Sequence, residues 1–149
     1  MSSKKPYLKF VNRLIVIAFL AALSGCGDAS SPTSPGPELA GTYTATTFVV
    51  VVPGHEPFDV LAGGGGLTII IARDLTTSGT LTAPSSITGS PAPTRSMAGS
   101  ASLRGATVTF SQSEDTFVQH LEWILSGKTL SVANALAGPG FFTVTLTRP

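Results

Sequence analysis

Two stretches of this sequence hold side chains that could bind a metal ion or move protons. His55, Glu56 and Asp59 gather an imidazole and two carboxylates within five residues, and protein metal sites are built from such groups when about three of them converge. Glu114 and Asp115 are adjacent carboxylates, but neighbouring residues of a strand point to opposite faces, so they would not work together as acid and base. Both stretches therefore fit polar loops better than catalytic or metal sites.

Other patterns that can carry chemistry are incomplete. Glycines 63–66 have no lysine nearby and precede a strand pattern rather than a helix, so they predict a hairpin loop and not a phosphate-binding loop. His120 is expected to face solvent beside Glu122, and a metal or haem role would be favoured if it lay close to His55. No serine stands in a Gly-x-Ser-x-Gly elbow. The sequence thus predicts no catalytic residues, no metal site and no cofactor.

The charged residues are few and unevenly placed along the chain. Lys4, Lys5, Lys9 and Arg13 make up four of the nine basic residues, whereas all eight acidic residues follow Cys26. From Cys26 onward the chain carries five basic and eight acidic residues, a net charge of −3. Such a segment has no basic surface for a phosphate backbone, so we expect no nucleic-acid partner.

The basic residues at the start precede an uninterrupted apolar run. Residues 14–23 are ten apolar residues, about 15 Å long as a helix at 1.5 Å per residue, whereas a membrane-spanning helix needs about 20 residues. A basic head, a short apolar core and the small residues Ser24 and Gly25 are typical of a signal peptide. We therefore predict that residues 1–25 form a signal peptide that is removed.

Cys26, the only cysteine of the chain, follows this leader directly. The sequence Leu23-Ser24-Gly25-Cys26 resembles the lipobox of bacterial lipoproteins. This resemblance implies cleavage between Gly25 and Cys26, a diacylglyceryl group on the Cys26 sulphur, and acylation of the new amino terminus, for example with palmitate. Two or three acyl chains would hold the protein on a membrane. An ordinary secretory signal that has a cysteine near its cleavage site is the alternative.

Residues 26–38 join this cysteine to the rest of the chain and contain Pro32, Pro35 and Pro37 among serines and glycines. Such a composition forms no packed element, so we predict a disordered tether. In bacterial lipoproteins an aspartate directly after the cysteine often retains the protein in the inner membrane. Gly27 holds that position here, so the resemblance implies the outer membrane in a cell with two membranes.

Apolar and polar residues alternate over much of residues 39–149, which is the pattern of half-buried strands and indicates one β domain. The alternation and the turn residues between segments predict eight strands, over residues 41–52, 67–71, 76–83, 97–103, 106–110, 117–125, 130–132 and 142–146. Residues 117–125 also fit one face of a helix, but Trp123 and the turn residues 126–128 favour a strand.

Eight short strands with short turns predict an all-β fold, an eight-stranded antiparallel up-and-down barrel in which the first and last strands meet. Closing the barrel would pair the apolar residues 49–52, which would otherwise form an exposed strand edge. The segments 39–43, 67–69, 115–118, 126–130 and 144–148 resemble the lipocalin-like domains of small bacterial lipoproteins. Tyr43 stands close to the place of that family's signature tryptophan.

Six side chains are candidates for the interior of such a barrel. An eight-stranded barrel holds either packed side chains or one small ligand, so these residues would fill the interior or line a cavity, and filling is favoured. The six residues are Tyr43, Leu81, Phe110, Phe117, Trp123 and Phe142.

These features together predict a lipid-anchored envelope lipoprotein whose non-catalytic barrel has an interaction or structural role. Its expected partners are the membrane, through the acyl chains on Cys26, and an envelope protein. The alternative is a carrier of a small apolar ligand inside the barrel. A metal-binding, haem-binding or enzymatic protein is less favoured, because His55, Glu56 and Asp59 fit a polar loop and His120 is expected to face solvent from a strand.

Overall fold

Residues 36–88 and 93–149 are the part of the chain that the computed structural model describes. Residues 1–35 lie outside it. They hold the predicted signal peptide with its cleavage site at Gly25 and Cys26, and most of the predicted tether. Within the described residues, no helix has the length and apolar character needed to cross a bilayer. The short helix α1 (Gly36–Leu39) begins inside the predicted tether, so the regular structure starts three residues before the predicted boundary at Leu39.

Strands dominate the described residues, with three short helical segments between them. The strands are β1 (Gly41–Val51), β2 (Phe58–Asp59), β3 (Gly66–Ile71), β4 (Thr76–Thr82), β5 (Thr94–Ser96), β6 (Gly99–Arg104), β7 (Thr107–Gln112), β8 (Trp123–Ser126), β9 (Thr129–Ala137) and β10 (Gly140–Thr147). The helical segments are α1, α2 (Ser85–Thr88) and the 3-10 helix η1 (Phe117–His120).

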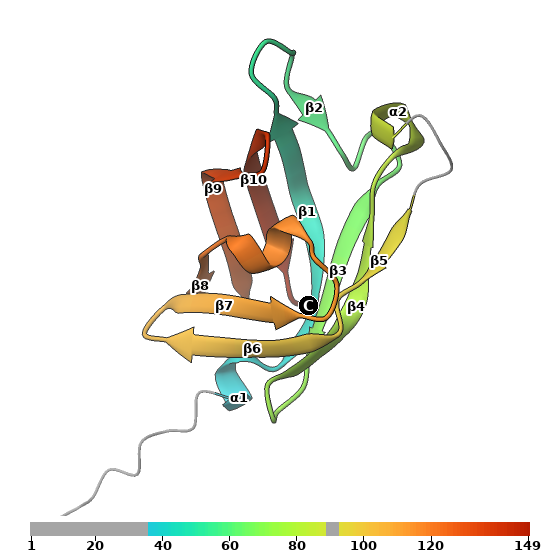
Figure 1. Ribbon diagram of the computed structural model, residues 1–149. Coiled ribbons are helices and arrows are strands. Elements are labelled where there is room, and N and C mark those ends of the chain that lie inside the picture. Colours follow the sequence, from blue (N-terminus) through green and yellow to red (C-terminus); the bar gives the residue numbers. More distant parts are fainter. Residues whose placement is uncertain (1–35, 89–92) are drawn as a thin grey trace, which may run out of the picture. The chain divides into compact units, whose positions relative to one another are not determined.

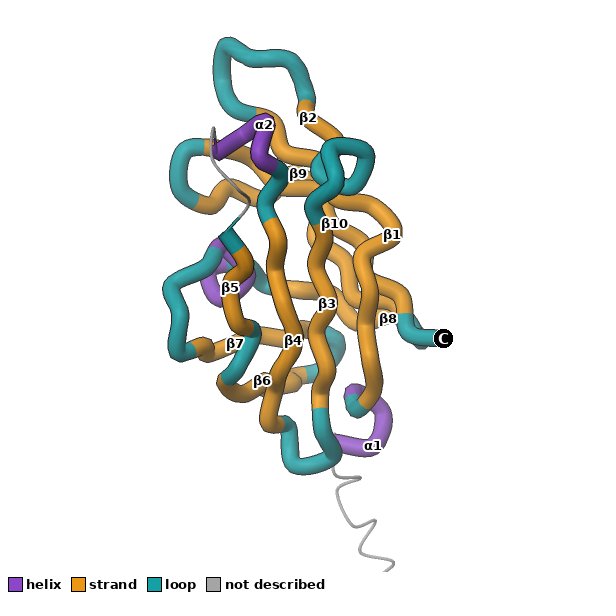
Figure 2. Tube along the Cα trace, turned by 90° about the vertical axis from the view of Figure 1, so that its right-hand side faces the viewer, coloured by secondary structure: helices purple, strands orange, loops and turns teal. Residues whose placement is uncertain are grey.

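The strands form one antiparallel sheet that closes on itself (Figures 1 and 2). Around the barrel the order is β1, β3, β4, β6, β7, β8, β9 and β10, and pairing of β10 with β1 closes the ring. The predicted eight-stranded antiparallel barrel is therefore confirmed. Two short strands that the sequence did not predict add to it, because β2 pairs with β1 and β5 pairs with the upper part of β4.

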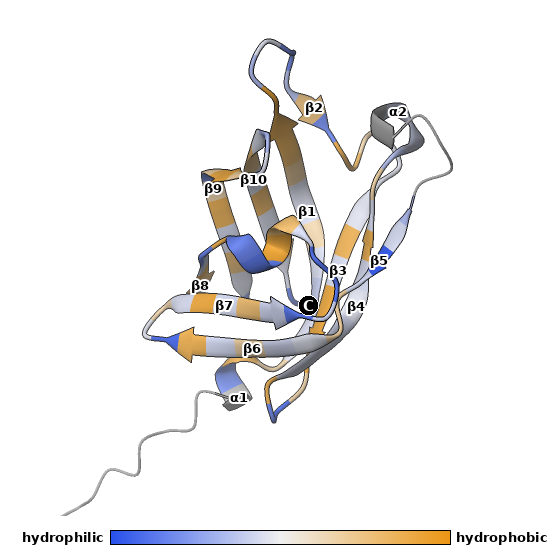
Figure 3. Cartoon of the chain, viewed as in Figure 1, coloured by the Kyte–Doolittle hydropathy of each residue, from blue (hydrophilic) through white to orange (hydrophobic). Residues whose placement is uncertain are grey.

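The alternation of side chains explains why these strands form a barrel. In β3, Leu67, Ile69 and Ile71 are at most 2% exposed, whereas Ile70 between them is 43% exposed. In β10, Val144 and Leu146 are fully buried. Figure 3 shows the resulting apolar bands along the strands. One face of each of the eight barrel strands thus joins a single hydrophobic core, and burial of this surface drives closure at about 25 cal/mol per Å² of apolar area.

The segment 117–125 differs from its prediction. It was assigned to one strand, but residues Phe117–His120 form η1 and only Trp123–Ser126 form β8. The indole Nε1 of Trp123 donates a hydrogen bond to the Val118 carbonyl oxygen at 3.1 Å. This contact closes the chain back on itself within five residues, which an extended strand would not permit. The apolar spacing fits both structures, so a contact within the core decides between them.

One end of the barrel is closed by α1 and the last strand. The Arg148 guanidinium donates hydrogen bonds to the carbonyl oxygens of Glu38 and Ala40, and its carbon lies 5.7 Å from the centre of the Tyr43 ring. The Tyr43 hydroxyl donates to the Leu39 carbonyl oxygen at 3.0 Å, and both side chains are fully buried. We call this the closed end. The opposite end, near β2 and α2 in Figure 1, is the mouth.

Candidate functional site

The mouth contains a pocket whose walls are almost entirely apolar. Its volume is about 260 Å³. Strand β1, the end of β4, η1 and the turn between β9 and β10 contribute its lining. The lining residues are Phe48, Val50, Val52, Val60, Leu81, Thr82, Ala83, Pro84, Phe117, Pro139 and Phe142. We call this the apolar pocket. It has no charged lining residue, so it suits a hydrocarbon or aromatic group.

Three phenylalanines from distant parts of the chain form one side of this pocket. Phe117 stacks on Phe142 with 4.3 Å between ring centres and 11° between ring planes. Phe48 meets Phe117 at 5.4 Å with a tilt of 47°. Strand β7 pairs with β8 only through Thr107 and Val108, so the chain between the two strands leaves the sheet. In that connection η1 brings Phe117 against Phe48 of β1 and Phe142 of β10. The 3-10 helix therefore positions the central ring of the pocket.

The six predicted interior residues divide between the pocket and the packed core. Leu81, Phe117 and Phe142 line the apolar pocket. In contrast, Tyr43, Phe110 and Trp123 are buried in the hydrophobic core and line none of the described pockets. Phe110 and Trp123 meet edge to face at 6.1 Å. These three side chains thus help to fill the interior of the barrel, whereas Leu81, Phe117 and Phe142 line a pocket at its mouth.

Phe48 and Val50 are lining residues that the sequence prediction missed. Alternation counted from Tyr43 would point even-numbered residues of β1 outward. The register between β1 and β10 shifts between Ala45 and Thr47, as in a β-bulge. A bulge adds one residue to a strand and reverses which side chains face inward beyond it. The bulge left no sign in the sequence, because the residues around it are mostly threonines and the apolar alternation that would reveal a change of face is missing there.

A second hollow adjoins the apolar pocket and has a polar edge. It encloses about 420 Å³ and shares Phe117, Pro139 and Phe142 with the apolar pocket. Its other lining residues are Asp115, Thr116, His120, Ala137 and Gly138. We call it the Asp115 hollow.

Asp115 is held by two hydrogen bonds at the edge of that hollow. Its Oδ1 accepts from His120 Nε2 at 2.7 Å and from Gln119 Nε2 at 2.8 Å. The hydrogen bond from His120, then that from Gln119, and then the charge of His120 lower the pKa of the Asp115 carboxyl below its usual value. The side chain is therefore a carboxylate at neutral pH, and it remains largely exposed.

A third hollow lies at the end of β1 and also adjoins the apolar pocket. It encloses about 290 Å³, shares Val50 and Val52 with the apolar pocket, and is completed by His55, Glu56 and Phe58. We call it the Glu56 hollow. His55 and His120 line different hollows. Among residues 36–88 and 93–149, no three metal-ligating side chains come together.

The remaining acidic candidates make local contacts. Asp59 Oδ1 accepts from the backbone amides of Leu61 and Ala62 at 2.9 and 3.1 Å, so this carboxylate shapes the turn after β2. Glu114 accepts a hydrogen bond from the Ser96 amide at 3.1 Å and lies 3.6 Å from Arg95. These contacts place both carboxylates in structural roles.

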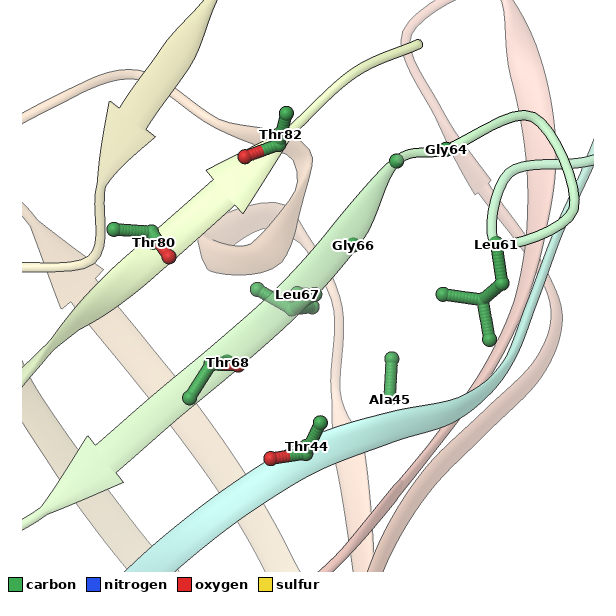
Figure 4. Close-up of a pocket in the computed structure, with 10 residues that line it drawn as sticks. Thr44, Ala45, Leu61, Gly64, Gly66, Leu67, Thr68, Thr80 and Thr82 are labelled. Atoms are coloured by element: carbon green, nitrogen blue, oxygen red, sulfur yellow. The ribbon is translucent and has the colours of Figure 1, made fainter.

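Glycines 63–66 lie in the loop before β3 and at its start, next to a shallow groove on the outer wall. The groove encloses about 310 Å³. Figure 4 shows its threonines, which are Thr44, Thr68, Thr80 and Thr82, along β1, β3 and β4. Its lining has neither a charge nor an aromatic ring, so it offers a ligand little beyond hydroxyl groups.

The hydrogen bonds of Asp115 make a prediction about its titration. In the His120→Ala variant the pKa of Asp115 is expected to rise toward its usual value, because the strongest contact that favours the charged form is removed. A lowered pKa in the folded state means that Asp115 adds stability above its ordinary pKa, and that this stability is lost as the pH falls through the lowered pKa. Carboxyl ¹³C NMR titration measures the Asp115 pKa in the wild type and the variant. An unchanged pKa in the variant would contradict the hydrogen bond from His120 as its main cause.

The topology of the barrel is consistent with a lipocalin-like fold, because eight strands follow one another around a closed antiparallel ring. Its closed end is fixed by Arg148 and Tyr43, and its mouth holds an apolar pocket flanked by two hollows with polar edges. Comparison of the chain with models of protein families, with curated proteins and with solved structures found no match.

Proposed function

We propose that this protein is a non-catalytic binding protein of the cell envelope that is anchored through lipid on Cys26 and holds a small apolar ligand in its mouth. The apolar pocket is the observation that carries the proposal. Its lining is apolar except for Thr82, and its aromatic side is preformed by the Phe117–Phe142 stack. A ligand there would gain the burial energy of its apolar surface without displacing core side chains.

The size of the pocket limits the ligand. A volume of about 260 Å³ lies just below the range of about 300–1,000 Å³ usual for small-molecule sites. Tyr43, Phe110 and Trp123 are buried in the hydrophobic core and do not line this pocket. The proposal is therefore a single short chain or one ring system, with the remainder of the molecule outside the barrel.

The anchor in this proposal rests on the leader and the Leu23-Ser24-Gly25-Cys26 sequence. Mass spectrometry of the protein extracted from membranes should find Cys26 as the first residue, with the added mass of its acyl chains. A Cys26→Ser variant should lose that mass and leave the membrane fraction after export. An unmodified Cys26 in the wild-type protein would rule out the anchor and leave the pocket argument unchanged.

The pocket itself can be tested by filling it. The full chain in phosphatidylcholine vesicles is titrated with the neutral apolar dye N-phenyl-1-naphthylamine, and energy transfer from Trp123, the only tryptophan of the chain, reports dye at the protein. Ala83 lines the pocket beyond the end of β4, so Ala83→Phe should fill it and weaken dye binding at least about tenfold, or about 1.4 kcal/mol.

The matched control is Ala106→Phe, which adds the same ring at an exposed turn between β6 and β7. This variant should bind the dye like the wild type. Equal binding by all three proteins would show that the dye is not in the apolar pocket. Weak binding by both variants would show an effect of the added ring rather than of its position, and would also count against the proposal.

A further inference from the structure

The residues around the mouth indicate the chemistry of the ligand's polar end. The Asp115 hollow and the Glu56 hollow each adjoin the apolar pocket and share lining residues with it. A ligand whose apolar part fills the pocket would therefore leave it past one of these two hollows. Its polar group would meet the side chains at that hollow's edge.

Those edges carry acceptors and negative charge. Each hollow is lined by one carboxylate and one imidazole: Asp115 with His120, and Glu56 with His55. None of the residues lining the apolar pocket or the two hollows is a lysine or arginine. A carboxylate or phosphate on a ligand would therefore meet a carboxylate at the edge of either hollow and no lysine or arginine to pair with, and His120 is already hydrogen-bonded to Asp115.

The Asp115 hollow is the better site for the polar group. It is the larger of the two hollows, and the shared rings of Phe117 and Phe142 form part of its wall. Asp115 Oδ1 accepts the hydrogen bonds from His120 and Gln119. Among the described contacts none involves Oδ2, the second carboxylate oxygen. An ammonium group could thus lie near aromatic faces and a carboxylate oxygen, both of which attract cations.

We infer that the ligand is an amphiphile with a cationic or hydrogen-bond-donating head, such as an amine, whose apolar part fills the apolar pocket and whose head meets Asp115. This inference rests on the proposed function, because it assumes that the pocket holds the apolar part. It adds the charge and hydrogen-bonding character of the head group, which favour alkylamines and alcohols over fatty acids.

Three probes that share an octyl chain and differ only in their head group test this inference. Octylammonium, 1-octanol and nonanoate are each titrated against bound N-phenyl-1-naphthylamine, with the full chain in phosphatidylcholine vesicles. Octylammonium is expected to displace the dye at a concentration at least about fivefold lower than nonanoate, with octanol between them. Asp115→Asn should reduce this preference at least threefold, because it removes the charge and keeps the shape.

The matched control is Glu122→Gln, which removes one negative charge from an exposed residue that lines neither the pocket nor its two adjoining hollows. It should keep the wild-type preference. Displacement by nonanoate as strong as by octylammonium, or the same change in both variants, would overturn the inference and leave the proposed function standing. If no probe displaces the dye, the proposed function fails with it.

Discussion

Replacing Trp123 by alanine is expected to lower the free energy of unfolding by about 3–5 kcal/mol. Trp123 is fully buried, and its ring meets Phe110 edge to face at 6.1 Å. Its Nε1 also holds the Val118 carbonyl oxygen at 3.1 Å, which fixes η1 to β8. The variant would lose a large buried surface, leave a cavity and leave that carbonyl without its donor. Urea unfolding followed by far-ultraviolet circular dichroism measures the loss.

Two further variants separate the causes of this effect. Trp123→Phe keeps an aromatic ring but removes the donor, so the lost hydrogen bond should cost about 1 kcal/mol before any loss of packing. Ile124→Ala changes the next residue, which is 48% exposed, and should cost much less than Trp123→Ala. A loss below about 1 kcal/mol for Trp123→Ala would show that the barrel tolerates an empty interior at this position.

The Gly79→Ala variant is expected to lose about 2–6 kcal/mol of stability, as the sum of two separate costs. Gly79 lies in β4 opposite Ile69 of β3, with φ at +126°. A side chain at this φ is strained by about 1–3 kcal/mol. Its Cβ would also clash with the backbone carbonyl oxygen of Thr68. Neighbouring strands cannot separate at one residue without loss of hydrogen bonds, so overpacking adds about 1–3 kcal/mol.

Gly105→Ala provides the matched comparison. Gly105 has φ at +60°, but a Cβ there would meet no atom within 4 Å. This variant therefore carries only the cost of a left-handed backbone, about 1–2 kcal/mol. Chemical denaturation of both variants gives the difference, which reports the clash together with the additional backbone strain at φ +126°. Equal losses in the two variants would mean that β3 and β4 have room for a methyl group between them.

The fold was predictable because most strands bury one face. In β3 the apolar residues Leu67, Ile69 and Ile71 stand at every second position, and this spacing gave both the strand and its inward face. The order of the strands followed from short connections, since hairpins place successive strands side by side. The strands β2 and β5 were not predictable, because two or three residues are too few for a pattern.

The errors have identifiable physical causes. In β1 the inward face changes between Tyr43 and Phe48 because of the register shift at Ala45, and threonines on both sides of the shift hide it. In η1 the apolar residues Phe117 and Val118 suit a strand equally well. Their conformation is set by a ring contact with Phe142, which is distant in the sequence, and by the hydrogen bond from Trp123 in the core.

The candidate site was partly predictable for the same reason. Residue type indicates that Leu81, Phe117, Trp123 and the other predicted interior residues face the inside of the barrel. It does not indicate how far from the mouth each side chain lies. Depth depends on strand length and register around the whole barrel. The proximity of Asp115 to the pocket also escaped the sequence, since it follows from the turn of η1 that brings His120 back to Asp115.

The pairing of β1 with β10 constrains the timing of folding. Thr44 pairs with Thr147, so the first strand of the ring must wait for the last residues of the chain to be synthesised. Synthesis from the amino terminus therefore completes β1 long before its partner. During that interval one edge of β1, with its valines at 49–51, lacks the strand that it pairs with in the barrel. That edge can then pair with a strand of another chain, so a delay in completing β10 would favour aggregation.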